Sequence, residues 1–107
     1  MVYERLDYRT SDGSLVIDFF FVYDSDARGW RIYIISGLDY KGRDASGQAT
    51  HRNHFDGDTY QSVCWRGRLS TLEEAKAVAA LWADCTAQYI KGGGSFDAIA
   101  KRLMKRR

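Results

Sequence analysis

Residues 15–24 constrain the fold of this chain more than any other segment, because large apolar side chains occur at both odd and even positions. In an extended strand, successive side chains point to opposite faces of the sheet. One face would carry Leu15, Ile17, Phe19, Phe21 and Tyr23, and the other would carry Val16, Asp18, Phe20 and Val22. A strand that is apolar on both faces is typical of a central position in a sheet. The segment therefore predicts a sheet with this strand inside it.

Turn residues divide the rest of the first two thirds into further strands. The Asp12-Gly13 pair predicts a hairpin after a strand over 2–9, and the polar run 25–29 predicts a second hairpin before a strand over 30–36. Shorter strands are expected over 48–54 and 59–66, with a mobile surface loop over 37–47. We predict an antiparallel sheet of four to five strands in meander order within residues 1–68.

The last third has the pattern of two helices. Ser70-Thr71-Leu72-Glu73 has the sequence of a capping box, and apolar residues then recur every three to four positions as far as Tyr89, which predicts a long helix over 70–91. Three glycines, 92–94, end it, and Ser95 begins a short basic amphipathic helix over 95–107. The fold class is α+β, with this helical hairpin packed on one face of the sheet.

Bulk properties limit the class of protein. With 107 residues, 45% of them hydrophobic and 28% charged, the chain predicts a single globular domain over 1–107. No apolar run approaches the roughly 20 residues that span a membrane, and the first residues do not resemble a signal peptide, so we expect no membrane association and a cytoplasmic protein. No set of acid, base and nucleophile stands out, so neither an enzyme nor a cofactor is predicted.

Charges are unevenly distributed along the chain. The first 29 residues contain six acids against three arginines, whereas the last seven contain five basic residues and no acid. An acidic surface can occupy a basic nucleic-acid channel of another protein. The acidic partner-binding face is predicted to consist of Asp7, Asp18, Asp24 and Asp26.

A second candidate surface combines aromatic and basic residues. Aromatic rings can stack on bases while cations contact phosphates, although a solvated sheet face with cross-strand aromatic pairs has the same composition. The nucleic-acid-binding candidates are Trp30, Arg31, Tyr33, Lys41, Arg43, Arg52, Arg66, Arg68, Lys101, Arg102, Lys105 and Arg106. Their interpretation as a direct DNA-binding surface is an alternative to protein binding.

Four residues are of the types that hold tetrahedral zinc, namely His51, His54, Cys64 and Cys85. The spacing of the histidines in an expected hairpin is awkward, and Cys85 lies on the apolar stripe of the long helix. We predict free cysteines and no metal, with a small zinc-binding structural protein as a further alternative.

The second face of the central strand raises the question of what covers it. One helix covers one side of a sheet, so Phe20, Val22, Tyr33 and Ile35 are candidates for contact with a partner or with a second copy in a homodimer. Packing of the second helix over that face is the competing explanation.

Two resemblances bear on function. Trp30-Arg31-Ile32-Tyr33-Ile34, residues 60–66 and the run 67–75 resemble Apetala-type and integrase arm-site DNA-binding domains, which implies a three-stranded sheet in the major groove braced by a helix. The whole chain, most of all residues 75–89, is similar to small uncharacterised proteins of phages and conjugative elements of Gram-positive gut bacteria. That resemblance implies an anti-defence factor of the anti-CRISPR type in a host bacterial cell.

Taken together, these features predict a non-enzymatic binding protein that inhibits a host nucleic-acid-processing machine. An RNA-guided nuclease is the sharpest expected target, so the expected partner is a nuclease or nucleoprotein complex, with nucleic acid as a further expected ligand.

Overall fold

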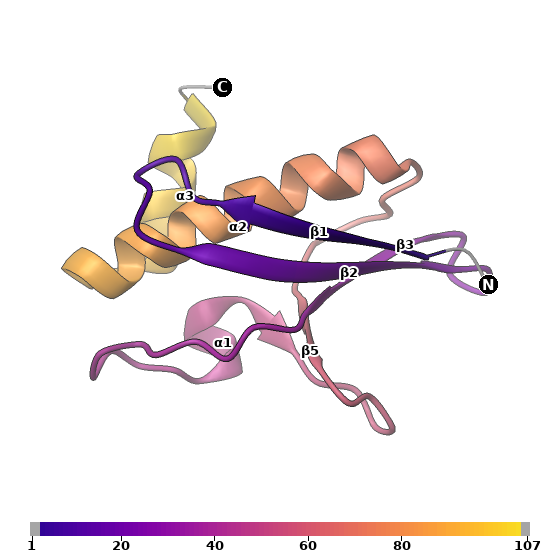
Figure 1. The fold of residues 1–107 in the computed structure, drawn as a ribbon, viewed down its shortest axis with the longest axis horizontal. Coiled ribbons are helices and arrows are strands. Elements are labelled where there is room, and N and C mark those ends of the chain that lie inside the picture. Colours follow the sequence, from indigo (N-terminus) through magenta and orange to yellow (C-terminus); the bar gives the residue numbers. More distant parts are fainter. Residues whose placement is uncertain (1–2, 106–107) are drawn as a thin grey trace.

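A computed structural model of the protein describes residues 3–105 and has two layers, a sheet and a pair of helices on one of its faces (Figure 1). The α+β fold class is confirmed. The elements in chain order are β1 (Tyr3–Arg9), β2 (Val16–Asp24), β3 (Gly29–Ile34), α1 (Gly47–Thr50), β4 (Arg52–Asn53), β5 (Gln61–Val63), α2 (Leu72–Gly92) and α3 (Phe96–Lys105). The predicted beginning of the first strand at Val2 lies outside the described residues.

The sheet is antiparallel and five-stranded, with strand order β1-β2-β3-β5-β4. The two predicted hairpins are present, and β2 lies inside the sheet as its sequence requires. The meander order is wrong at the end, because β5 pairs with β3 and displaces β4 to the edge. The chain crosses from β3 to β4 through a long excursion, so the later strand β5 takes the neighbouring position.

The core lies between the sheet and α2. Ile17, Phe19 and Phe21 are fully buried on the helix side of β2, and the Phe19 ring packs edge-on against Trp82 of α2. The opposite face of the sheet carries no helix among the described elements, and its side chains on β1, β2 and β3 are half-buried or exposed. The sequence therefore identified the correct buried face of β2.

The N-cap of helix α2 lies one residue later than predicted, and the helix begins at Leu72. Thr71, not Ser70, is the N-cap: its hydroxyl accepts from the backbone N–H of Glu74 at 3.1 Å, and the Glu74 carboxylate accepts from the backbone N–H of Thr71. Both serine and threonine can cap a helix, so the choice follows from the acid three positions later. At the other end, Gly93 donates to the carbonyl of Tyr89 and ends the helix as expected.

Helix α3 packs on α2 rather than over the second face of the sheet. Ser95 accepts from the N–H of Ala98, as predicted for its cap. Phe96, Ile99 and Leu103 are the buried residues of this helix.

The segment between β3 and β5 differs most from the prediction. Residues 48–54 form the short helix α1 and the two-residue β4 instead of one strand, because Ser46 caps α1 by accepting from Ala49 and the Thr50 hydroxyl donates back to the Ser46 carbonyl. Likewise β5 has three residues rather than the predicted eight.

The expected mobile loop over 37–47 is bound to the helices. Arg43 donates to the carbonyls of Ile90 and Lys91 at the end of α2, and the Tyr89 hydroxyl donates to the carbonyl of Asp44 at 2.8 Å. The two bonds from Arg43 satisfy carbonyls that a helix end otherwise leaves to water. The loop is therefore part of the helical layer.

Candidate protein-binding groove

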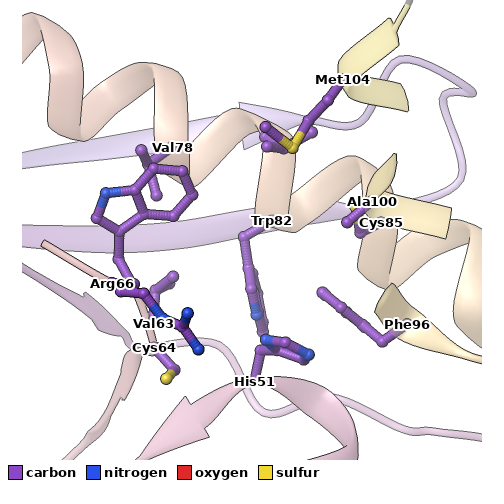
Figure 2. Close-up of a pocket in the computed structure, with 12 residues that line it drawn as sticks. His51, Val63, Cys64, Arg66, Val78, Trp82, Cys85, Phe96, Ala100 and Met104 are labelled. Carbon is purple, nitrogen blue, oxygen red and sulfur yellow. The ribbon is translucent and has the colours of Figure 1, made fainter. Parts of the chain in front are cut away.

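An apolar groove of about 300 Å³ lies where α2, α3 and the segment after β5 meet (Figure 2). Its floor is formed by Trp82, Cys85 and Phe96, which are buried. Figure 2 shows His51 and Arg66 on one side of the groove and Ala100 and Met104 of α3 on the other. The remaining lining residues are Val63, Cys64, Trp65, Val78 and Leu81.

Two large side chains at the groove stay exposed although they are apolar. Trp65 is 42% exposed and Met104 is 53% exposed. The apolar stripe of α3 is wider than the face that the core covers: Ile99 and Leu103 are buried, whereas Ala100 and Met104 turn to the groove. An exposed aromatic and a flexible thioether on one concave surface are typical of a protein-binding site.

The charges at the groove are positive. Its lining contains Arg66 and no aspartate or glutamate. Lys101 and Lys105 each follow a groove residue by one position on α3 and are exposed; since successive helix residues point about 100° apart, they lie on the surface of α3 that turns from the groove toward solvent. The surroundings therefore favour a ligand that is apolar where it enters the groove and acidic beside it.

His51 fixes one end of the groove. It ends α1 with a positive φ of 55°, stacks on the Phe96 ring with a centroid distance of 4.9 Å and places its Nε2 2.8 Å from an Asp97 carboxylate oxygen. These contacts join α1 to α3 and give a partner to Asp97, the acidic residue of α3. His51 therefore positions the groove wall.

The four candidate zinc ligands do not come together. His51, Cys64 and Cys85 line the groove, but His54 lies outside it and contacts the carbonyl of Asp58 through Nε2 at 2.9 Å. Over residues 3–105 no group of three histidine, cysteine or acidic side chains is placed to hold a metal ion. Neither cysteine forms a disulfide within residues 3–105; Cys64 is exposed and Cys85 is buried.

The four predicted partner-binding acids do not form an acidic face. Asp7 and Asp18 are opposite each other on β1 and β2, but Arg5 pairs with Asp18, and Arg31 pairs with Asp24 at 3.1 Å. The pKa of Asp24 is lowered by the backbone N–H of Ala27 and then by Arg31. Asp26 lies apart, in the turn between β2 and β3. Charges of both signs alternate on this surface, so it cannot act as a continuous acidic mimic.

The twelve nucleic-acid candidates separate into unconnected groups. Trp30 faces the helix side of β3 and packs on Tyr23, whereas Arg31 and Tyr33 face the other side, where both contact Asp58. Arg43 and Arg52 serve the fold: Arg52 donates to Thr50, Gln61 and Ala45 and lies over the Tyr40 ring. They form no common stacking platform.

The remaining members of that set are exposed and scattered. Lys41 pairs with Asp39 in the loop, Arg68 packs beside Gly29, and Arg102 donates to Gln88. Arg66 lines the groove, and Lys101 and Lys105 are exposed on α3. Arg106 lies outside the described residues.

The helix-free face of the sheet is partly covered by the chain itself. Arg31 stacks on Phe55 at 4.9 Å and Tyr33 donates to Asp58 at 3.4 Å, so the segment between β4 and β5 packs over this face. Phe20, Val22, Tyr33 and Ile35 are all half-buried. Tyr33 is therefore partly covered by the chain's own segment before β5 and not by α3.

Sequence reasoning missed the groove as a site. It placed Trp65 in a predicted strand over 59–66 and Met104 in an amphipathic helix over 95–107, and it did not bring the two segments together. The available signal was an excess of apolar positions on a ten-residue helix that packs along one side only.

No protein-family model, curated protein or solved structure matches this chain. In the part that the structure describes, no helix has the length and apolar character that a membrane crossing requires.

Proposed function

We propose that this protein is a non-enzymatic binding protein that docks an amphipathic, acidic helix of a partner protein into the groove between α2, α3 and the end of β5. The observation that carries the proposal is the groove itself, with Trp65 and Met104 exposed at its edge and a buried apolar floor. A helix that enters such a groove anchors itself by apolar residues one turn apart.

The size and chemistry of the groove support a protein segment over other ligands. A volume of about 300 Å³ is at the lower end of ligand pockets and suits a few apolar side chains better than a large cofactor. Val63, Val78 and Leu81 are aliphatic and offer no hydrogen bonds to base edges. Arg66, Lys101 and Lys105 favour acids beside the anchors.

The expectation of an anti-defence inhibitor is compatible with this proposal and stays a prediction. Inhibition of an RNA-guided nuclease would then depend on a helix of the nuclease or of its complex, because the alternating charges of the sheet leave no acidic surface that could imitate nucleic acid.

The test is a selection from a displayed library of helical peptides against the intact protein. Selected peptides should carry apolar residues at i and i+4 flanked by Asp or Glu. Truncation of a tryptophan that a ligand covers is expected to weaken binding by about 30-fold, so Trp65→Ala should bind the selected peptides about 30-fold more weakly. Tyr60→Ala is the matched control, because Tyr60 is an aromatic residue of similar exposure away from the groove.

Two results would contradict the proposal. One is that Trp65→Ala and Tyr60→Ala bind the selected peptides equally well. The other is that a single-stranded DNA oligonucleotide at low salt quenches Trp65 fluorescence and binds in a Trp65-dependent manner, which would make the groove a nucleic-acid site.

A further inference from the structure

The outer edge of β1 is an unpaired strand edge. In the strand order β1 is terminal and pairs with β2 alone, and no backbone bond from residues 3–105 reaches its other side. Its seven residues contain no proline, glycine or lysine, but four of them are charged, which restricts the strands that can pair with this edge. A regular free edge of this length can accept a further antiparallel strand.

The charges of β1 select the strand that can pair with it. Tyr3, Arg5, Asp7 and Arg9 lie on the helix-free face, and Glu4, Leu6 and Tyr8 lie on the helix side. Pairing with a second copy about a two-fold axis at Leu6 places Arg5 opposite Asp7 of the other copy, twice. Opposite charges in directly opposed positions stabilise a strand pair.

Other registers that keep both faces in phase and pair at least five residues of β1 are unfavourable. A centre at Arg5 places two Arg5 side chains opposite each other, and a centre at Asp7 opposes two Asp7 side chains and places Arg5 against Arg9. Like charges in opposed positions destabilise a sheet. Among registers that pair at least five residues, the sequence of β1 is therefore complementary to itself in one only; a centre at Tyr8 also opposes Asp7 and Arg9, but it pairs only residues 7–9 of the strand.

We infer that two copies of this protein join their β1 edges in that register to form a continuous ten-stranded antiparallel sheet.

Groups that have no strong partner within one copy support this pairing. Within residues 3–105, Asp7 makes no ion pair and Arg9 makes neither an ion pair nor a hydrogen bond, while Tyr3 is 61% exposed. The dimer places the Arg9 guanidinium opposite the Tyr3 ring of the second copy, where a cation can stack on the ring. The half-buried Leu6 meets Leu6 across the two-fold axis.

The helices leave room for the second copy. The backbone of helix α2 packs over β2 and β3, and α2 reaches β1 through side chains, Lys76 to Glu4 and Asp84 to Tyr8, so each copy of α2 lies on its own side of the new seam. Pairing all seven residues forms about six to eight backbone hydrogen bonds. The groove between α2 and α3 stays open, since none of its lining residues belongs to β1.

The experiment is sedimentation velocity of the full chain from about 1 to about 500 µM, a range suited to the weak association of interfaces below about 1,200 Å². The wild type should shift from monomer to dimer across this range. Asp7→Arg should raise the dimer dissociation constant at least about tenfold, because two attractive pairs become repulsive. Asp26→Arg makes the same charge change in a distant turn and should have no effect.

A charge swap tests the register. In the Arg5→Asp, Asp7→Arg double variant the opposed pairs are again attractive, and the new arginine lies directly opposite Asp18 of its own copy, so the fold keeps an ion pair. Circular dichroism confirms folding of each variant. The double variant should dimerise as the wild type does, and hydrogen exchange of amides in 4–9 should slow at high concentration.

A wild type that is monomeric over the whole range overturns the proposal. A dimer that Asp7→Arg does not weaken, or a folded double variant that stays monomeric, overturns it as well. A dimer lost on Phe20→Arg but kept in Asp7→Arg assigns the contact to the sheet face instead. Because Trp65→Ala leaves β1 unchanged, failure of this proposal is distinguishable from failure of the groove proposal.

Discussion

Replacing Arg52 by alanine should destabilise the protein, although the sequence marks Arg52 and Arg66 alike as surface cations. The Arg52 guanidinium donates to the Thr50 hydroxyl at 2.8 Å, to the Gln61 side chain at 2.8 Å and to the Ala45 carbonyl at 2.6 Å. It also lies 4.9 Å from the centroid of the Tyr40 ring, which is buried. The side chain thereby joins α1, β5 and the loop that precedes α1.

The magnitude follows from those contacts. A hydrogen bond from a charged group contributes about 1.5–3 kcal/mol, but three bonds of one half-buried side chain are not additive. We expect a loss of about 2–4 kcal/mol from a total stability of about 5–15 kcal/mol. Such a loss lowers a urea midpoint by about 1–3 M when the slope is about 1.5 kcal/mol/M.

The assay is urea unfolding followed by tryptophan fluorescence and circular dichroism. Arg66→Ala is the matched control, because Arg66 is exposed at the groove and makes no hydrogen bond or ion pair within residues 3–105; its variant should stay within about 0.5 kcal/mol of the wild type. Arg52→Lys should recover little, because an ammonium group cannot reach three acceptors in a planar fork. Equal midpoints for Arg52→Ala and Arg66→Ala would refute the structural role of Arg52.

Three further outcomes are expected. Asp84→Ala should cost about 2–4 kcal/mol in chemical unfolding, because the buried carboxylate accepts from the Ser11 backbone N–H and hydroxyl at 2.8 Å; a loss below about 1 kcal/mol would contradict it. The N–H of Ser14, then side-chain hydroxyls and Lys91, hold the pKa of Asp12 well below its usual range, so its contribution is present above pH 4 and is lost on acidification. Acid titrations monitored by circular dichroism should show a shallower loss of stability for Asp12→Asn than for the wild type, and parallel curves would exclude this role. Phe96→Ala should cost about 3–5 kcal/mol in thermal melts because its ring is buried, whereas a small loss would show that α3 is dispensable for the fold.

Much of the fold was predictable because local patterns and the tertiary structure agree. Alternation located both faces of β2, and the glycines at 92–94 separated the two helices. Such agreement is expected where propensity, turn chemistry and burial favour one arrangement.

The segment between β3 and β5 was not predictable from local patterns, because its conformation depends on distant residues. The Trp82 indole donates to the Thr50 carbonyl at 3.0 Å, and Arg43 reaches the end of α2 from 47 or more positions away. Polar composition indicated a mobile loop, whereas these long-range bonds hold it in place.

The candidate site had a similar limit. The sequence showed which cations exist, but their roles depend on what lies next to them: Arg52 serves the fold and Arg66 borders a groove. A cation that has several hydrogen-bond acceptors nearby stabilises the fold. The pattern of a single sequence does not show which cations have such neighbours.

The position of the core has a consequence for synthesis of the protein on the ribosome. The apolar side of β1, β2 and β3 is complete early, but its cover, α2, is encoded only after residue 71. Until that helix emerges, Phe19 and Phe21 have no partner layer, and the nascent hairpins expose an apolar surface of the kind that chaperones bind. The loop over 37–47 can reach its final conformation only after the end of α2 has been synthesised, since Arg43 binds the carbonyls of residues 90 and 91. Folding of this chain is therefore completed after most of it has been translated, and a truncated translation product would be prone to aggregation and degradation.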